Sequence, residues 1–221
     1  MTACLLCQQA LKKRTLFSDI FLLKKEKEGV CTDCKEKFLL ISETHCPTCF
    51  KEGENKSCSD CLYWNEKGMT VAHESLYRYN TQMADYISRY KFAGDYLLRN
   101  VFMAELKNYF GDKMDKTLVP IPVSKQRMAE RGFNQVIGLL TVAGLSFQEV
   151  LQKEDTQKQS EKTRQERLAL CQPFSIIEKV AIPSNILLVD DVYTTGTTIQ
   201  FAKQILMKNG AKTVTSFSLA R

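Results

Sequence analysis

Residues 186–198 read Ile186-Leu187-Leu188-Val189-Asp190-Asp191-Val192-Tyr193-Thr194-Thr195-Gly196-Thr197-Thr198, and this stretch decides the fold of the chain. Four aliphatic residues without polar alternation are typical of a strand that is buried on both faces of a parallel sheet. The apolar pattern from Ile199 to Leu206 predicts that a helix follows. The stretch therefore indicates an α/β fold, a parallel sheet flanked by helices.

Two acids and a threonine-rich turn follow this strand, at the edge where open α/β sheets bind ligands. Backbone N–H groups at a Gly/Thr turn that opens a helix form an anion site, and the helix dipole reinforces it. Adjacent acids can accept hydrogen bonds from hydroxyls or hold a hydrated divalent cation. The pattern predicts a site for a ribose 5-phosphate; the bland alternative is a capped helix with solvated acids. The predicted site consists of Asp190, Asp191, Thr194, Thr195, Gly196, Thr197 and Thr198.

The composition is that of an ordinary soluble globular protein. Hydrophobic residues make up 44% and charged residues 25% of the 221 residues, which leave room for one mid-sized and one small domain. The net charge of +6 permits binding to a polyanion but does not require it. The apolar run 16–23 is too short to span a bilayer, and the first residues lack the pattern of a secretory signal. We therefore expect a cytoplasmic protein.

Eight of the nine cysteines form four Cys-x-x-Cys pairs, a spacing that lets two thiolates reach one zinc ion. Without an export signal, metal binding is favoured over disulfides. We predict two structural Zn²⁺ sites, with sequential pairing preferred and cross-brace pairing left open. Eight thiolates suffice for two ions, so His45 is interpreted as a neighbour and Cys171 as a small apolar residue. The predicted ligands are Cys4, Cys7, Cys31, Cys34, Cys46, Cys49, Cys58 and Cys61.

These cysteines define a zinc-ribbon-like module over residues 1–66, followed by a sheet domain over 67–221. The module has too few clustered apolar side chains to form a core, so zinc would supply its folding free energy. In the sheet domain, Thr81 is the expected N-cap of a helix, and a second helix is expected over 95–110. Between them, residues 89–95 interleave aromatic and basic side chains. Such a segment either stacks nucleic-acid bases or packs its aromatics into the core.

A basic loop follows the strand expected over Thr117–Val123, whose two prolines force the chain to turn. Parallel strands open on the same side, so Lys125, Arg127 and Arg131 can face the acidic crevice and bind a pyrophosphate. The alternative is a solvated basic helix start, which the helix dipole disfavours. Residues 153–167 contain no aliphatic or aromatic side chain. We interpret them as a flexible hood, either a disordered insertion or a lid that delivers cations.

Several of these motifs together resemble the ComF (ComFC) family. They are the four cysteine pairs, Tyr90-Lys91-Phe92-x-Gly94-Asp95, the run from Pro120-Ile121-Pro122 to Arg131-Gly132-Phe133-Asn134-Gln135, and Val189-Asp190-Asp191-Val192-Tyr193-Thr194-Thr195-Gly196. The resemblance implies a type I phosphoribosyltransferase-like fold. It also implies that both acids hold ribose hydroxyls, Thr194 to Thr198 the 5-phosphate, and Pro122 to Lys125 the pyrophosphate of phosphoribosyl pyrophosphate, with Mg²⁺ bridging.

For function, the resemblance implies a late competence protein that handles incoming single-stranded DNA during natural transformation. Implied partners are the ComFA helicase-like ATPase at the inner face of the membrane and DprA. The alternative is a working phosphoribosyltransferase that acts on an unidentified acceptor. Its chemistry would rest on Mg²⁺ and preorganised charge. No segment specifies a purine or pyrimidine acceptor, and no catalytic residue is assigned.

Overall fold

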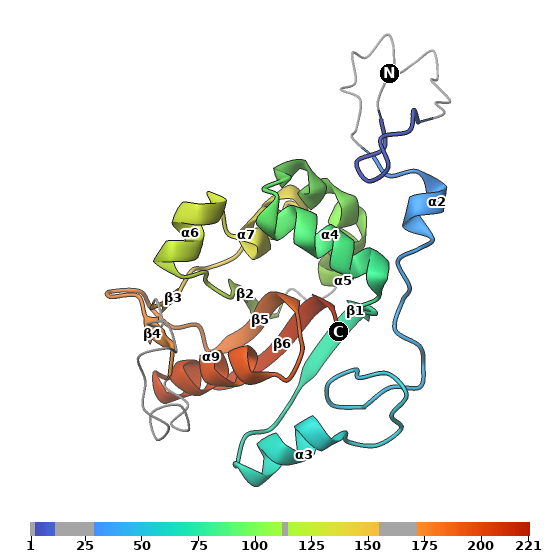
Figure 1. Cartoon of the computed structure of the whole chain (residues 1–221). Coiled ribbons are helices and arrows are strands. Elements are labelled where there is room, and N and C mark those ends of the chain that lie inside the picture. Colours follow the sequence, from blue (N-terminus) through green and yellow to red (C-terminus); the bar gives the residue numbers. More distant parts are fainter. Residues whose placement is uncertain (1–2, 12–28, 112–114, 155–171) are drawn as a thin grey trace, which may run out of the picture.

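The computed structural model describes residues 3–11, 29–111, 115–154 and 172–221 of the chain (Figure 1). At its centre lies a four-stranded parallel sheet in the order β1-β6-β5-β2. Its strands are β1 (His73–Tyr77), β2 (Thr117–Pro120), β5 (Asn185–Val192) and β6 (Thr213–Ala220).

Helices cover both faces of this sheet, with α9 (Thr197–Lys208) on one face and α4, α5 and α7 on the other (Figure 1). Strand β5 serves both layers: Leu187 and Val189 pack with the α4 side, whereas Ile186 and Leu188 pack with the α9 side. An uninterrupted aliphatic run is what a strand buried on both faces requires. The expected parallel sheet flanked by helices is confirmed. The three helices named on the face opposite α9 are α4 (Thr81–Phe92), α5 (Met103–Gly111) and α7 (Gln135–Val142).

The chain leaves β2 and β5 at the same edge of the sheet, because Pro120 lies opposite Val189 in a parallel register. Strand β2 ends at Pro120, earlier than the expected Val123, although the Ile121 N–H still donates to the Val189 carbonyl at 2.9 Å. The basic segment that follows is not a loop but a short helix, α6 (Lys125–Arg131). Ser124 caps it, since its Oγ accepts the Arg127 N–H at 3.4 Å.

Three further elements differ from expectation. The N-cap of α4 is Asn80 rather than Thr81: its Oδ1 accepts the Met83 N–H at 2.9 Å. The second helix begins as a 3₁₀ segment, η1 (Tyr96–Phe102), before α5. An antiparallel pair, β3 (Leu151–Lys153) and β4 (Phe174–Ile176), was not predicted, because three residues are too few to reveal an alternating pattern. It flanks the expected hood, most of which lies outside the described residues.

The cysteine module, with α2 (Thr32–Lys35) and α3 (Ser59–Glu66), runs along the β1 edge of the sheet (Figure 1). The Ile41 N–H donates to the Leu76 carbonyl at 3.0 Å, and the Arg78 N–H donates to the Leu39 carbonyl at 2.8 Å. Phe38 joins the main core beside Tyr77, Tyr86 and Phe102. The module therefore packs directly on the sheet domain. Within the described part of the chain, no helix is long and apolar enough to cross a membrane.

Candidate functional site: an acid pair and a threonine loop beside two cysteine clusters

The acid pair lies at the carboxyl end of β5, and its two members are 8% (Asp190) and 2% (Asp191) exposed. Asp190 Oδ1 accepts the N–H of Asp191, and Asp191 Oδ1 accepts the N–H of Val192, both at 2.9 Å. Burial, and next the charge of Asp191, raise the pKa of Asp190 well above its usual range. The backbone thus fixes both acidic side chains at the carboxyl edge of the sheet.

Lys91 is a site residue that the sequence analysis did not assign. It lies near the end of α4, and its ammonium group forms an ion pair with Asp191 Oδ2. The Lys91 side chain is 18% exposed, so the pair is largely shielded from water. Tyr90, the residue before it, is fully buried and donates its hydroxyl to the Gln135 carbonyl at 2.9 Å. The Tyr90-Lys91-Phe92 motif was the available signal, because a buried aromatic at this place fixes where the lysine points.

The threonine loop connects the acid pair to α9. Gly196 has φ = +83° and is the N-cap of α9, a left-handed conformation that favours glycine. Thr194 and Thr195 are exposed, and the Thr195 and Thr197 hydroxyl oxygens lie 2.9 Å apart. The helix begins directly after the loop, so its dipole adds to the loop N–H groups. Hydroxyls and amides at a helix start suit a phosphate dianion.

The three predicted cations of the basic segment have different environments. Burial lowers the pKa of Arg131, and the charge of nearby Asp191 partly opposes this shift. The Arg131 Nη1 donates to Gln135 Oε1. Arg127 instead donates to Glu130 of the same helix at 2.9 Å, with both side chains about half exposed. Lys125 is exposed and lines a separate cavity. Among the three, Arg131 is the cation that approaches the acids.

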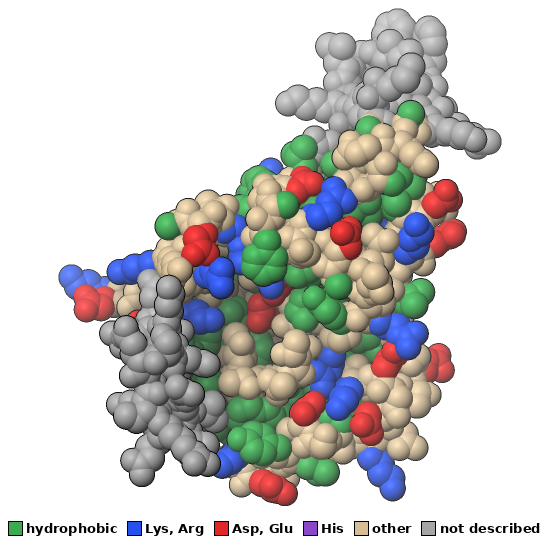
Figure 2. Space-filling model, viewed as in Figure 1, with side chains coloured by type: hydrophobic (Ala, Val, Ile, Leu, Met, Phe, Trp, Pro, Cys, Tyr) green, Lys and Arg blue, Asp and Glu red, His purple; other side chains and the backbone are tan. Residues whose placement is uncertain are grey.

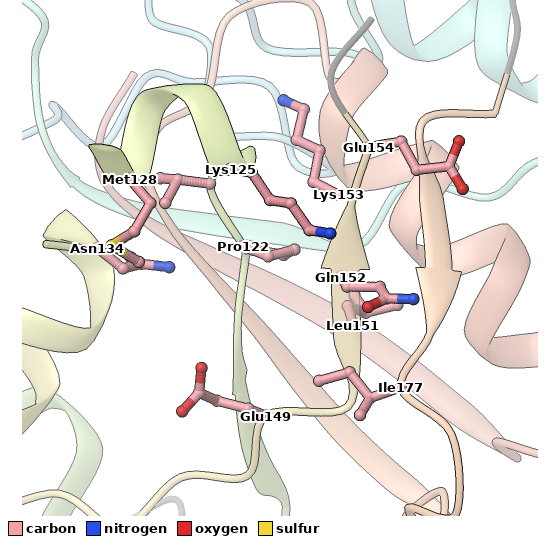
Figure 3. Close-up of a pocket in the computed structure, with 11 residues that line it drawn as sticks. Pro122, Lys125, Met128, Asn134, Glu149, Leu151, Gln152, Lys153, Glu154 and Ile177 are labelled. Carbon is pink, nitrogen blue, oxygen red and sulfur yellow. The ribbon is translucent and has the colours of Figure 1, made fainter. Parts of the chain in front are cut away.

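This cavity, of about 510 Å³, lies between α6 and the β3–β4 pair. In Figure 3, Lys125 extends from the start of α6 toward Gln152 on β3. The lining includes Pro122 and Asn134 but neither acid, so the cavity adjoins the predicted pyrophosphate segment rather than the acid pair. On the face seen in Figure 2, Lys and Arg side chains gather over α6 and around the hollow beside it.

The eight paired cysteines form two groups of four, Cys4/Cys7/Cys31/Cys34 and Cys46/Cys49/Cys58/Cys61, whose sulfur atoms lie within 4.8 Å of one another in each group. This is the sequential pairing. Neighbouring sulfur atoms within the groups, such as those of Cys7 and Cys31 and those of Cys49 and Cys58, lie 3.5 to 3.8 Å apart. A tetrahedral Zn²⁺ with Zn–S bonds of about 2.3 Å requires S···S edges of roughly 3.8 Å. Both groups therefore fit a closed structural zinc site.

Within the second cysteine group, Cys46 is the member whose pKa is lowered, whereas burial raises the pKa of Cys61 to about 11 and that of Cys49 well above its usual range. Burial raises the pKa of Cys46, but hydrogen bonds from the Thr48 hydroxyl and from backbone N–H groups outweigh it and lower that pKa to about 6. One of these donors is the Cys58 N–H, 3.4 Å from Cys46 Sγ. The group also packs in one apolar cluster with Ile186 and Leu188 of β5. It is thus part of the core beneath the acid pair and the threonine loop.

Comparison with known proteins places the chain among competence proteins, although no family model matches it. It is 44% identical over 218 residues to the competence protein ComFC of Streptococcus pneumoniae, covering 99% of both chains. It is 36% identical over 227 residues to ComFC of Bacillus subtilis, covering 99% of this chain and 94% of that relative. Competence protein F of Haemophilus influenzae is 26% identical over 217 residues, with 88% of this chain and 91% of the relative covered.

Among solved structures, a phosphoribosylpyrophosphate synthetase from Mycobacterium smegmatis matches with a TM-score of 0.33 and 16% identity, over 54% of this chain and 33% of that one. A hypoxanthine phosphoribosyltransferase from Staphylococcus aureus matches with a TM-score of 0.30 and 15% identity, over 63% of this chain and 65% of that one. Both TM-scores are low, so the assignment rests on the sequence relatives. By its identity to two full-length relatives, this chain belongs to the ComFC family of competence proteins.

Proposed function

We propose that this protein acts in natural transformation, handles incoming single-stranded DNA, and binds phosphoribosyl pyrophosphate at the β5 edge. One observation supports this pocket most strongly: along one continuous segment, the buried acid pair is followed by the threonine loop and then by the start of α9. Each part suits one part of the ligand: carboxylates for the ribose hydroxyls, and loop amides and hydroxyls for the 5-phosphate. The names of the relatives support the role in competence.

The pyrophosphate would lie against Pro122 to Lys125, at the neighbouring strand end, with Arg131 as the nearest predicted cation to the acids. Oxygen donors are the ligand type that Mg²⁺ prefers, so Asp190 and Asp191 would hold the ion, which would supply positive charge to the pyrophosphate. Lys91 already supplies one positive charge at Asp191. Together these residues would bind the ligand without a protein nucleophile.

A candidate surface for single-stranded DNA lies beside this pocket, on the segment that interleaves aromatic and basic residues. The Phe92 ring is 70% exposed, and the Arg131 guanidinium lies 5.9 Å from its centroid. Tyr96 is 38% exposed and carries the Arg99 guanidinium 3.9 Å from its ring centroid. Exposed rings next to cations suit stacked bases and phosphates. Tyr90 of the same segment is buried, so this residue follows the core-packing interpretation and leaves Phe92 as the exposed ring of the segment.

We further propose that the protein works in the cytoplasm with the ComFA helicase-like ATPase and with DprA, and reaches the inner face of the membrane through such partners. This setting fits a protein that receives DNA as it enters the cell. Co-purification with each partner, with and without single-stranded DNA, tests it. If the wild-type protein co-purifies with neither partner under either condition, a direct contact is excluded.

The DNA surface is tested by replacing Phe92 with alanine. Base–aromatic stacking contributes about 1–3 kcal/mol per base, so Phe92→Ala should weaken binding to an oligothymidine roughly tenfold. Fluorescence anisotropy at several salt concentrations measures this. Tyr79→Ala removes a ring that is 48% exposed just after β1 and is the matched control. Equal losses in both variants, or no salt-sensitive DNA binding by the wild type, would exclude this surface.

The alternative, a working phosphoribosyltransferase, is favoured by one observation. The cavity of about 510 Å³ adjoins Pro122 and Lys125, where an acceptor could reach the reacting carbon (Figure 3). Release of pyrophosphate from phosphoribosyl pyrophosphate in the presence of cell extract would support transfer. The double variant Asp190→Ala/Asp191→Ala separates the two hypotheses in cells. If this variant is folded, no longer binds the ligand and still supports normal transformation, the pocket has no role in competence.

A further inference from the structure

Two residues that belong to neither the acid pair nor the threonine loop donate hydrogen bonds to carbonyl groups of the loop. The Trp64 indole Nε1 donates to the Thr195 carbonyl at 2.8 Å. The Arg221 Nη1 donates to the Thr194 carbonyl at 2.5 Å. A Cβ added to Gly196 would overlap the Tyr193 hydroxyl and lie 3.3 Å from Trp64 Nε1, so the loop rests directly on these rings.

These two hydrogen bonds decide which way the loop amides point. In a trans peptide, the C=O of one residue and the N–H of the next point in opposite directions. When Arg221 binds the Thr194 carbonyl and Trp64 binds the Thr195 carbonyl, the N–H groups of Thr195 and Gly196 are turned away from both donors. A phosphate bound on that opposite side would meet amides that are already aligned, with no cost of reorientation.

Trp64 is fixed by the helix that carries two cysteines of the second group. Cys58 precedes α3, and Cys61 and Trp64 follow at intervals of three residues, which places all three on one side of the helix. All three are buried, with Trp64 only 3% exposed. A zinc ion bound by Cys46, Cys49, Cys58 and Cys61 would therefore fix the position of the indole.

Arg221 connects the same cysteine group to the loop from the other end. Its Nη2 lies 4.0 Å from Cys58 Sγ and 3.6 Å from Asp60 Oδ2. Its guanidinium also lies 4.6 Å from the centroid of Tyr193, whose ring stacks on His73 at 3.9 Å. Four thiolates on one zinc ion carry a net negative charge, which would attract Arg221 at this distance. The side chain is 5% exposed, so water screens this attraction little.

We infer that Trp64 and Arg221 are positioning residues for the phosphate loop, and that they make its affinity for a sugar phosphate depend on the metal in the second cysteine group. This inference rests on the proposed phosphoribosyl pocket. It assigns the zinc module a part in ligand binding: metal binding orders α3, α3 holds Trp64, and Trp64 with Arg221 orients the loop amides. The first cysteine group contacts α4 instead of the threonine loop, since the Leu5 and Leu6 carbonyls accept hydrogen bonds from Arg89.

The test uses the full-length, zinc-loaded protein and ribose 5-phosphate as the probe. Trp64 is the single tryptophan of the chain, so its fluorescence reports this contact directly. We expect its emission to change when ribose 5-phosphate binds and when zinc is removed. One hydrogen bond to the loop corresponds to a loss of about five- to tenfold in affinity, which calorimetry should detect for Trp64→Phe and for Arg221→Gln. Leu62→Ala, on an exposed position of α3, is the matched control and should bind as the wild type does.

Metal dependence is tested with one cysteine variant from each group. Cys49→Ser should lose one zinc per chain and the ribose 5-phosphate affinity, whereas Cys7→Ser should lose one zinc and keep the affinity. Wild-type affinity in folded Trp64→Phe and Arg221→Gln would overturn the inference while leaving the pocket intact. An equal loss in Cys7→Ser and Cys49→Ser would overturn the assignment to the second group. If the wild type binds neither ribose 5-phosphate nor phosphoribosyl pyrophosphate, the proposed pocket fails first and the inference with it.

Discussion

At the scale of single residues, the two acids at the end of β5 have unlike surroundings. Asp191 faces the ammonium group of Lys91, whereas the pKa of Asp190 is raised by burial and by the neighbouring charge of Asp191. The acids themselves were predictable, because two carboxylates after an aliphatic strand stand out in the sequence. Lys91 was not assigned, since it lies 100 residues earlier and only the packing of α4 brings it to the sheet edge.

Replacing Asp190 with asparagine should stabilise the protein at neutral pH and weaken ligand binding. The pKa of the Asp190 carboxyl is higher in the folded state than in the unfolded state, so the folded state keeps the proton to a higher pH. The wild type therefore loses stability as the pH rises above about 4, the pKa of an unfolded aspartate. Asparagine cannot ionise but still accepts the Asp191 N–H. Thermal melts between about pH 4 and 8 should show Asp190→Asn gaining over the wild type as pH rises. Calorimetry should show about tenfold weaker binding of phosphoribosyl pyrophosphate. Lower stability of the variant at neutral pH would contradict this account.

Lys91→Met should destabilise the fold by about 3 kcal/mol, because it leaves the Asp191 carboxylate buried without its cation. Urea denaturation measures the loss. Adding Asp191→Asn to Lys91→Met should recover most of it. Lys35→Met removes a pair with Glu105 whose side chains are 31% and 30% exposed, and serves as the control with a smaller loss. A Lys91→Met loss no larger than the control loss would show that the buried pair is unimportant.

At the scale of elements, the unit from β5 through the threonine loop to α9 was predictable nearly in full. Its aliphatic run, acids, glycine and amphipathic helix each have a local physical cause. The elements that sequence reasoning missed are short ones. Helix α6 has seven residues with none buried, and β3 and β4 have three residues each. Such short elements show no repeating pattern of apolar residues from which they could be predicted.

Gly196→Ala tests this unit. Its φ of +83° costs a residue with a side chain about 1–2 kcal/mol, and the new methyl group would also overlap the Tyr193 hydroxyl. We expect a larger loss of stability than the strain alone gives, together with loss of sugar-phosphate binding. Gly210→Ala, with φ = +105° and nothing within 4 Å of its added Cβ, isolates the strain. Denaturation midpoints compare the two. Equal losses at both positions would mean that the loop does not pack on Tyr193 as described.

At the scale of the whole molecule, the cysteine module and the sheet domain share their packing. The four cysteine pairs predicted two metal sites from spacing alone, and the structure brings the sulfurs together as two such groups. The sequence could not predict that one group packs under the threonine loop. Trp64 and Thr195 are separated by 131 residues, and only the completed fold joins them. Relatives named as competence proteins identify the family, while the phosphoribosyl pocket is our proposal from the acid pair and the threonine loop.

We propose above all that the β5 edge of this ComFC-family protein binds phosphoribosyl pyrophosphate through its acid pair and threonine loop. Isothermal titration calorimetry of the zinc-loaded protein with phosphoribosyl pyrophosphate and Mg²⁺ tests it most directly. We predict saturable binding with one ligand per chain, which Asp190→Asn/Asp191→Asn abolishes while its circular dichroism and zinc content stay those of the wild type. Absence of saturable binding by the wild type, or unchanged binding by the double variant, would contradict the claim.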